Sequence, residues 1–146
     1  KKQWVVKGSS ILLYKFLEKS LEELKPYIEY SKKTTAAFLR TLFDADGSIY
    51  VDIRRGRRVR RLWLYNTDRE LLIYVQYLLK KYFDIDTTGP HLVREKGDIR
   101  YSPYGVNKAT KNYYSIYVRV RSLLNFYKNI GFVIRRKQRD LIKAIQ

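Results

Sequence analysis

The chain has 146 residues, of which 31 are Lys or Arg and 14 are Asp or Glu, and its formal net charge is +17. A hydrophobic content of 45% indicates a folded domain with its own core and excludes a disordered basic tail. The charge predicts a polyanionic partner, and nucleic acid is favoured over a membrane because no apolar run approaches the length of a membrane span. The sequence has no Cys, which excludes disulfides and thiolate metal sites and favours an intracellular protein, cytoplasmic or organellar.

The first segment with helical periodicity spans residues 9–24. Ser9 or Ser10 can cap it, and Pro26 interrupts it. We assign residues 1–33 to an N-terminal helical extension that packs on the rest of the chain, and residues 34–146 to a single domain. The apolar face of the predicted helix carries Ile11, Leu12, Phe16, Leu17, Leu21 and Leu24.

Helix and strand patterns alternate from residue 34 onward. A helix from about residue 34 to 44 stops at Gly47, a residue suited to a helix C-terminus. Two strands follow, with Gly56 at the turn between them. Thr67 and Glu70 form a capping box that starts the next helix. The predicted core side of the two strands consists of Ile49, Val51, Ile53, Leu62 and Leu64.

The second half of the chain adds two more strands and two helices. Residues 91–95 are predicted as a third strand, followed by a long polar loop, and residues 114–121 as a fourth strand. Helices at 122–129 and from about 133 to the end close the chain. Paired strands with tight turns predict an α+β fold, in which helices pack on one face of an antiparallel sheet.

The sheet face that is turned away from the helices is rich in Arg and aromatic residues and nearly free of acids. Arg matches phosphate oxygens and guanine edges, and a two-stranded ribbon fits the major groove of DNA. A solvated basic surface is the alternative, but the chain offers few acids to pair with these Arg side chains. The predicted DNA-contacting residues are Ser48, Tyr50, Asp52, Arg54, Arg55, Arg57, Arg58, Arg61, Trp63, Tyr65, Arg94, Tyr117 and Arg119.

Two carboxylates, Asp44 and Asp46, stand at the C-terminal end of the helix that precedes the first strand, where the helix dipole disfavours anions. Their presence suggests a task such as holding a cation. The same helix carries a stripe of small residues that includes Ala37, Thr41 and Asp44 or Ala45. Because a small stripe permits close packing of another backbone, we expect a second helix from a partner related by a two-fold axis.

The segment from Leu39 to Gly47 resembles the signature of the LAGLIDADG homing endonucleases. The order of elements from about residue 34 to the C-terminus is also similar to that of the family. The resemblance implies a saddle-shaped DNA-binding sheet and a helix-pair dimer interface that involves Ala37, Thr41 and Asp44. The residues that match the signature letter for letter are Leu39, Leu42, Asp44, Ala45, Asp46 and Gly47; Phe43 is a conservative replacement, and Arg40 and Thr41 depart from it.

The resemblance also implies roles for individual residues. Asp46 would bind Mg²⁺ or another divalent cation at the scissile phosphate, with the Ala45 carbonyl as a second ligand. Asn66 stands where the family places an amide that orders the nucleophilic water, and Arg121 where it places a basic residue near the phosphate. Bound Mg²⁺ can activate water for phosphodiester hydrolysis. No small-molecule cofactor is expected, and the single histidine, His91, is interpreted as structural or DNA-facing.

The resulting hypothesis is a homodimeric, Mg-dependent, site-specific homing endonuclease, encoded in an intron or intein. It would make a staggered double-strand break in a long, partly palindromic DNA target. Two alternatives stay open: a maturase-like RNA-binding protein on the same fold, and a DNA-binding regulator without activity. Asp46 argues against both, because a carboxylate beside phosphate is a burden for a protein that only binds.

Overall fold

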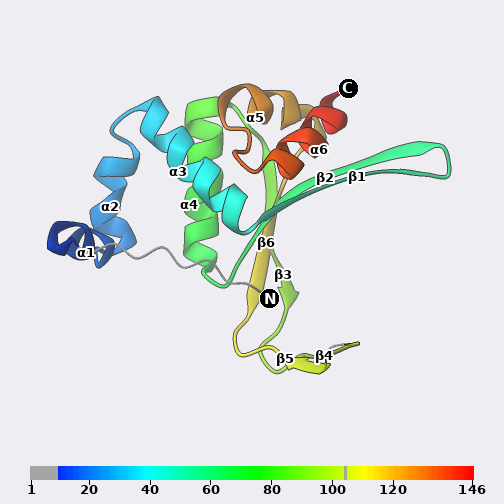
Figure 1. Ribbon diagram of the computed structural model, residues 1–146, viewed down its shortest axis with the longest axis horizontal. Helices are drawn as coiled ribbons and strands as arrows, with labels where there is room; N and C mark the ends of the chain where they lie inside the picture. Colours follow the sequence, from blue (N-terminus) through cyan, green and yellow to red (C-terminus); the bar gives the residue numbers. More distant parts are fainter. Residues whose placement is uncertain (1–9, 104) are drawn as a thin grey trace.

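The computed structural model describes residues 10–103 and 105–146, and it shows one sheet covered by helices on one face only (Figure 1). The side chains of Leu13, Tyr14, Leu17 and Arg54 lie outside the described part. In chain order the elements are α1 (Ile11–Leu17), α2 (Leu21–Ile28), α3 (Lys32–Ala45), β1 (Gly47–Arg54), β2 (Arg57–Asn66), α4 (Arg69–Phe83), β3 (Thr87–Arg94), β4 (Ile99–Ser102), β5 (Gly105–Lys108), β6 (Tyr113–Val118), a 3₁₀ turn (Val120–Ser122), α5 (Leu123–Asn129) and α6 (Arg135–Ile145).

The main sheet has four antiparallel strands in the order β1-β2-β6-β3. Strands β4 and β5 form a separate hairpin between β3 and β6, and this hairpin projects away from the helices (Figure 1). The predicted α+β class with helices on one face of an antiparallel sheet is therefore confirmed.

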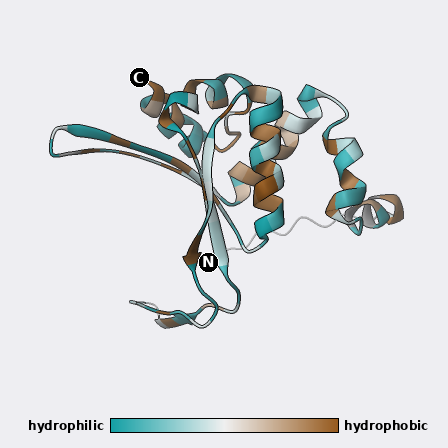
Figure 2. Cartoon of the chain, turned by 180° about the vertical axis from the view of Figure 1, so that it is seen from behind, coloured by the Kyte–Doolittle hydropathy of each residue, from teal (hydrophilic) through white to brown (hydrophobic). Residues whose placement is uncertain are grey.

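The core lies between the inner face of the sheet and the helices. Figure 2 shows the hydrophobic bands of α4 in brown, and the buried residues of this helix include Leu72, Val75 and Leu79. From α3, Phe43 packs edge-on against Phe126 of α5, with 4.8 Å between ring centroids. Burial of this apolar surface supplies the main driving force for folding of the domain.

The predicted helix over residues 9–24 is wrong, because two helices, α1 and α2, occupy most of that span. Ser20 begins α2 with a capping box, in which its hydroxyl accepts from the Glu23 N–H and the Glu23 carboxylate accepts from the Ser20 N–H at 2.9 Å. This arrangement satisfies helix N-terminal donors and starts a new helix at Ser20. Pro26 lies inside α2 instead of ending a helix, and Ser9 lies outside the described residues.

Helix α2 is fastened to the domain by Glu29, which caps its C-terminus. The Glu29 carboxylate accepts hydrogen bonds from Tyr74 at 3.0 Å, Tyr82 at 2.8 Å and Lys81 at 3.0 Å, all on α4. Burial alone would raise the pKa of Glu29, but these hydrogen bonds outweigh it and lower the pKa. The ionised carboxylate of Glu29 thus links the extension to α4.

Three further boundaries differ from the sequence prediction. Helix α4 is capped by Asp68, whose carboxylate accepts from the Leu71 N–H at 3.0 Å, and not by a Thr67–Glu70 box. Strand β3 starts four residues before the predicted 91, and the predicted polar loop contains the β4–β5 hairpin. Strand β6 ends at Val118 instead of residue 121, because the next residue's N–H donates to Asp86 outside the sheet.

No helix in the described ranges combines the length and hydrophobicity that a membrane crossing requires.

Candidate metal turn and nucleic-acid interface

The turn from α3 into β1 carries the two carboxylates of the signature. Asp46 ends the helix, and its N–H donates to the Leu42 carbonyl at 2.9 Å. Its side chain is exposed, and within residues 10–103 and 105–146 the carboxylate has no hydrogen bond or ion pair. Gly47 is required next to it, because an added Cβ would lie 2.5 Å from the Phe43 carbonyl oxygen. The turn therefore presents one carboxylate that is available to a ligand.

The second carboxylate of the turn, Asp44, is used within the chain. Its two oxygens accept from the N–H groups of Val133 and Ile134, at 3.0 and 3.2 Å, at the start of α6. An acidic side chain at a helix N-terminus satisfies unpaired N–H groups and complements the helix dipole. Asp44, which the sequence assigned to the dimer interface, thus binds α6 of its own chain through its carboxylate.

Lys137 of α6 binds this turn, and it was not among the residues predicted from the sequence. It is only 7% exposed, and its ammonium donates to the carbonyls of Phe43 at 3.0 Å, Asp44 at 2.6 Å and Gly47 at 2.6 Å. Burial lowers the pKa of Lys137, while the nearby Asp44 and Asp46 carboxylates act in the opposite direction. The signal was present in the sequence, since Lys137 lies on the same helix face as Leu141 and Ala144, four and seven residues further on.

A depression of about 270 Å³ opens beside Asp46 and is lined by Tyr65, Asn66, Thr67 and Tyr113. The register brings these residues together, because Asn66 at the end of β2 pairs with the second residue of β6. The side-chain oxygen of Asn66 accepts from the Asp68 N–H at 2.8 Å, so this oxygen is engaged at the start of α4. The amide N–H₂ of Asn66 remains as its donor group.

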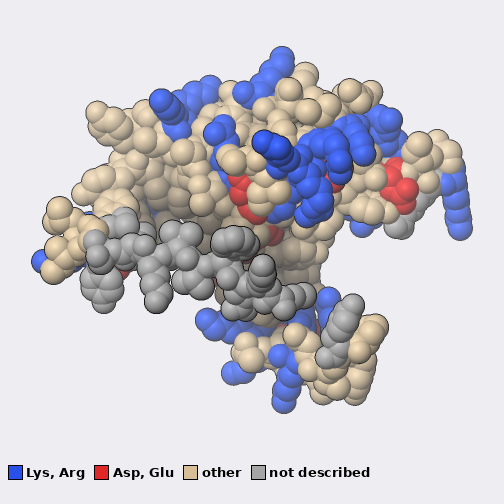
Figure 3. All heavy atoms as spheres, viewed as in Figure 1, with Lys and Arg blue, Asp and Glu red and all other residues tan. Residues whose placement is uncertain are grey.

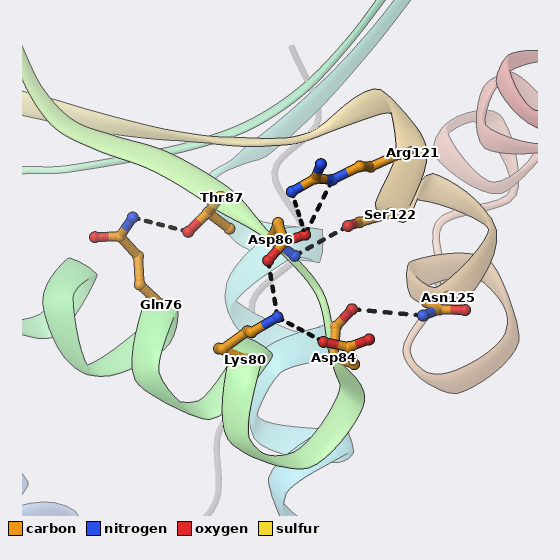
Figure 4. Close-up of polar contacts among 8 residues, drawn as sticks. All are labelled: Gln76, Lys80, Asp84, Asp86, Thr87, Arg121, Ser122 and Asn125. Carbon is orange, nitrogen blue, oxygen red and sulfur yellow. Dashed lines mark hydrogen bonds and ion pairs between the residues drawn. The ribbon is translucent and has the colours of Figure 1, made fainter.

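Arg121 does not join this cluster. Because β2 and β6 are antiparallel, the end of β6 lies beside Leu62, at the opposite end of the strands from Asn66. There the Arg121 guanidinium binds Asp86, with contacts of 2.8 and 3.1 Å, and Lys80 binds the other Asp86 oxygen (Figure 4). Hydrogen bonds from Lys80 and Arg121 lower the pKa of Asp86. The strand that was expected to carry Arg121 to Asp46 runs the other way.

The outer sheet face carries an aromatic strip across β2, β6 and β3. Trp63 packs against Tyr65 and Tyr117 with centroid distances of 6.1 and 6.4 Å, and His91 lies 6.0 Å from Tyr117. Burial raises the pKa of Tyr65, as does the neighbouring Tyr117, whereas Arg100 of β4 and Arg61 act in the opposite direction. His91 is therefore part of this face, beside the strip.

Two hairpins extend from the sheet on the side away from the helices. The β1–β2 hairpin turns at Arg55 and Gly56, which both have positive φ, and projects so far that Ile53 is 68% exposed instead of lying in the core. On the face shown in Figure 3, Lys and Arg gather over α6 and this hairpin and again around β4–β5, with a hollow between them.

The remaining predicted DNA-contacting residues differ in how they are held. Arg57, Arg58 and Arg61 are exposed on β2, and Arg119 is exposed just after β6. Tyr50 and Asp52 of β1 bind one another at 2.6 Å, and Ser48 pairs with Trp63 in the register. Arg94 instead donates to the Asp98 and Asn107 carbonyls, at 3.0 and 2.6 Å, and so fixes the base of the β4–β5 hairpin.

The small-residue stripe of α3 faces outward. Ala37, Thr41 and Ala45 are exposed, and the Thr41 hydroxyl donates back to the Ala37 carbonyl at 2.9 Å. Because of this bond within the helix, the Thr41 hydroxyl needs no hydrogen bond from a second chain. The exposed side chains of the stripe are therefore short, and another backbone can approach the helix closely.

These features define a class: an α+β domain with an acidic turn at the base of an open, basic antiparallel sheet. The chain belongs to the LAGLIDADG family, since residues 33–131 match the model of the LAGLIDADG-like domain. It is 31% identical over 145 residues to an uncharacterised protein of Methanocaldococcus jannaschii, covering 99% of this chain and 49% of that protein. It is also 33% identical over 141 residues to a DNA polymerase of Thermococcus litoralis, covering 92% of this chain and 8% of that protein. The chain therefore spans half or less of the length of these relatives.

Among solved structures, the fold is similar to that of a variant of I-DmoI in complex with its target DNA in the presence of magnesium. The TM-score is 0.53 at 22% identity, and the match covers 88% of this chain and 62% of that one. This likeness supports the fold of the chain, independently of the signature in its sequence.

Proposed function

We propose that this protein is a site-specific endonuclease that cuts both strands of a DNA duplex and leaves a staggered break. The observation that carries this proposal is the exposed Asp46 carboxylate, which has no partner in the described ranges and lies at the base of a basic sheet in a LAGLIDADG domain. The nearby Lys137 ammonium donates to three main-chain carbonyls and not to this carboxylate, so Asp46 would repel phosphate if the protein only bound DNA. A divalent cation between the two removes that repulsion.

The donors at the turn fit a hard cation such as Mg²⁺, which prefers oxygen ligands. Asp46 and the Ala45 carbonyl would hold it, and DNA phosphates would supply further oxygens. The described residues contain no group of three acidic or His side chains, so one chain alone offers too few ligands to hold the ion tightly. Bound Mg²⁺ would activate water and stabilise the leaving oxygen. Asn66 would donate a hydrogen bond from its amide N–H₂ to the nucleophilic water. Lys137 would hold the turn in place through its bonds to three carbonyls.

The open sheet face and its two hairpins would contact the duplex in the hollow of Figure 3. Arg55, Arg57, Arg58 and Arg61 of the β1–β2 hairpin are suited to phosphates and guanine edges, and Arg100 adds charge from β4. The aromatic strip of Trp63, Tyr65 and Tyr117, between the two hairpins, would make apolar contacts with the duplex. The side chain of Arg54 lies outside the described part and stays a prediction from the sequence.

Two active sites are needed to cut two strands, and one chain carries a single acidic turn. We propose that a second copy packs on the exposed stripe of Ala37, Thr41 and Ala45 and brings its own Asp46 next to the first. A two-fold axis between the copies would match a target that is at least partly palindromic. The target would then be long, since each copy contributes a sheet.

The proposal is tested by incubating the protein with a random duplex library and Mg²⁺ and sequencing the broken ends. Asp46→Asn is assayed in parallel, with Asp84→Asn at the end of α4 as the matched control. Staggered cuts at one near-palindromic site by the parent and the control, and none by Asp46→Asn, support the proposal. Equal cutting by Asp46→Asn would mean that the active site lies elsewhere.

A maturase-like RNA-binding role is a second candidate, favoured by the aromatic strip of Trp63, Tyr65 and Tyr117. Exposed aromatic residues on a sheet are a common platform for unpaired bases. Tight binding of a structured RNA by the parent and by Asp46→Asn, without cutting of any duplex, would favour this role. The same result with duplex DNA would favour a regulator.

A further inference from the structure

The depression beside Asp46 is lined by a tyrosine to which the proposed function gives no role. Tyr113 is the first residue of β6, and it lines the depression together with Asp46, Asn66 and Thr67. Side chains alternate along a strand, so Tyr113 lies on the same outer face as Tyr117, which pairs with Trp63. Tyr113 is thus at the end of the open face, next to the carboxylate.

Several groups at or near this depression are already engaged. The Asn66 oxygen is bound by the Asp68 N–H, and the nearby Tyr117 raises the pKa of Tyr65 by hydrogen bonding to its hydroxyl and by its charge. Arg94 pairs with Tyr113 in the register, and its guanidinium donates to main-chain carbonyls at the base of the β4–β5 hairpin. The Tyr113 hydroxyl, in contrast, has no hydrogen bond to any residue that the structure describes.

A phenol suits this position better than a cation does. A guanidinium or ammonium beside Asp46 would pair with its carboxylate and compete with a metal ion for it. A phenol is neutral at physiological pH and still donates one hydrogen bond to a phosphate oxygen. It can therefore bind the phosphate without neutralising Asp46.

We propose that Tyr113 is a catalytic residue that contacts the substrate. Its hydroxyl donates a hydrogen bond to a non-bridging oxygen of the DNA phosphate next to the cation that Asp46 would bind. The inference rests on the proposed function and extends it. Tyr113 adds a second donor beside the amide N–H₂ of Asn66, whose oxygen already accepts from the Asp68 N–H.

The test compares Tyr113→Phe with the parent protein on the duplex that the library experiment selects. Single-turnover cleavage is measured with Mg²⁺, and DNA affinity with Ca²⁺. We expect Tyr113→Phe to cut about tenfold more slowly, to bind the duplex more weakly and to keep the parental thermal unfolding midpoint, since one hydrogen bond to a charged group is lost. Tyr30→Phe, whose side chain is 85% exposed at the α2–α3 corner, serves as the matched control and should cut at the parental rate.

A second readout separates the failure of this inference from the failure of the proposed function. Central phosphates of the bound duplex are replaced one at a time by methylphosphonates, and binding is measured for both proteins. If Tyr113 binds a phosphate, one replacement per half-site weakens the parent but not Tyr113→Phe. Parental cutting by Tyr113→Phe, or equal losses of both proteins at every phosphate, would overturn the inference. A parent that binds but never cuts would refute the endonuclease and leave the phosphate scan to decide on Tyr113.

Discussion

The main-chain carbonyl of Asp44 accepts a 2.6 Å hydrogen bond from Lys137, while the carboxylate of the same Asp44 accepts from the N–H groups of Val133 and Ile134, just before α6. The end of α3 is therefore bound both to α6 and to the segment that leads into it. Asp46 lies two residues after Asp44. Its position is therefore set by α3 and α6, two helices that are far apart in the sequence.

Lys137→Met should destabilise the fold by about 3 kcal/mol or more, because three carbonyls lose their donor and two of these bonds are buried. Lys143→Met, at an exposed position of the same helix, should change stability by less than about 0.5 kcal/mol. Urea unfolding of both variants measures the difference. Equal stability of the two would mean that Lys137 does not hold the turn.

The two carboxylates of the turn should respond in opposite ways. Asp44→Ala removes the acceptor of the Val133 and Ile134 N–H groups before α6 and should cost about 1 to 2 kcal/mol of unfolding free energy. Asp46→Asn removes an exposed charge from a helix C-terminus, so stability should stay equal or rise while cleavage is lost. Thermal unfolding and cleavage assays on both variants check this, and a stable Asp44→Ala would contradict the first part.

Stability should depend on pH through Glu29, whose pKa in the fold is lower than its ordinary value of 4.5. The folded state then binds fewer protons, so the contribution of Glu29 is present above pH 4.5 and is lost as the pH falls through the lower folded value. Glu29→Gln should lower stability by about 1 to 2 kcal/mol at pH 7 and by much less under acid conditions. Urea unfolding at both pH values tests this, and a difference that grows on acidification would have the wrong sign.

The β1–β2 hairpin should contribute counter-ion release to DNA binding. Arg57→Ala and Arg58→Ala should each weaken affinity and reduce the slope of log K against log salt by about one. Lys15→Ala on α1 removes the same charge far from the sheet and serves as the control. Binding titrations at several salt concentrations measure the slopes, and three identical slopes would remove the hairpin from the interface.

Arg121→Ala distinguishes the structural placement of this residue from the role implied by the family resemblance. Its guanidinium binds Asp86 at the far end of β6, so cleavage should stay within about threefold of the parental rate. Cleavage kinetics at saturating Mg²⁺ provide the measurement. A loss of a hundredfold or more would show that Arg121 reaches the phosphate in the DNA complex.

Much of the fold could be predicted from sequence because its periodic elements are strongly patterned. The segments of β1, β2 and α4 combine alternating or helical apolar positions with clear turn residues. The β4–β5 hairpin was missed because its exposed residues show no contrast between a buried and a solvated face. Capping choices such as Asp68 over Thr67 depend on one hydrogen bond, which periodicity does not reveal.

The candidate site was predictable only where its residues are contiguous. Asp44, Asp46 and Gly47 form one short segment, and their turn could be interpreted directly from the sequence. Lys137 lies about ninety residues away and reaches this turn through the packing of α6. Arg121 was assigned from the family resemblance, but the antiparallel register of β2 and β6 determines which end of β6 lies near Asp46.

The β1–β2 hairpin extends beyond the hydrophobic core, so that even Ile53 is largely in solvent. Substitutions along its outer half therefore change few buried contacts, and the domain should fold with many different sequences there. Affinity for a new target can then be selected at the hairpin while the acidic turn and the core stay the same. In this chain, evolvability of recognition follows from the physical separation of the recognition arm and the core.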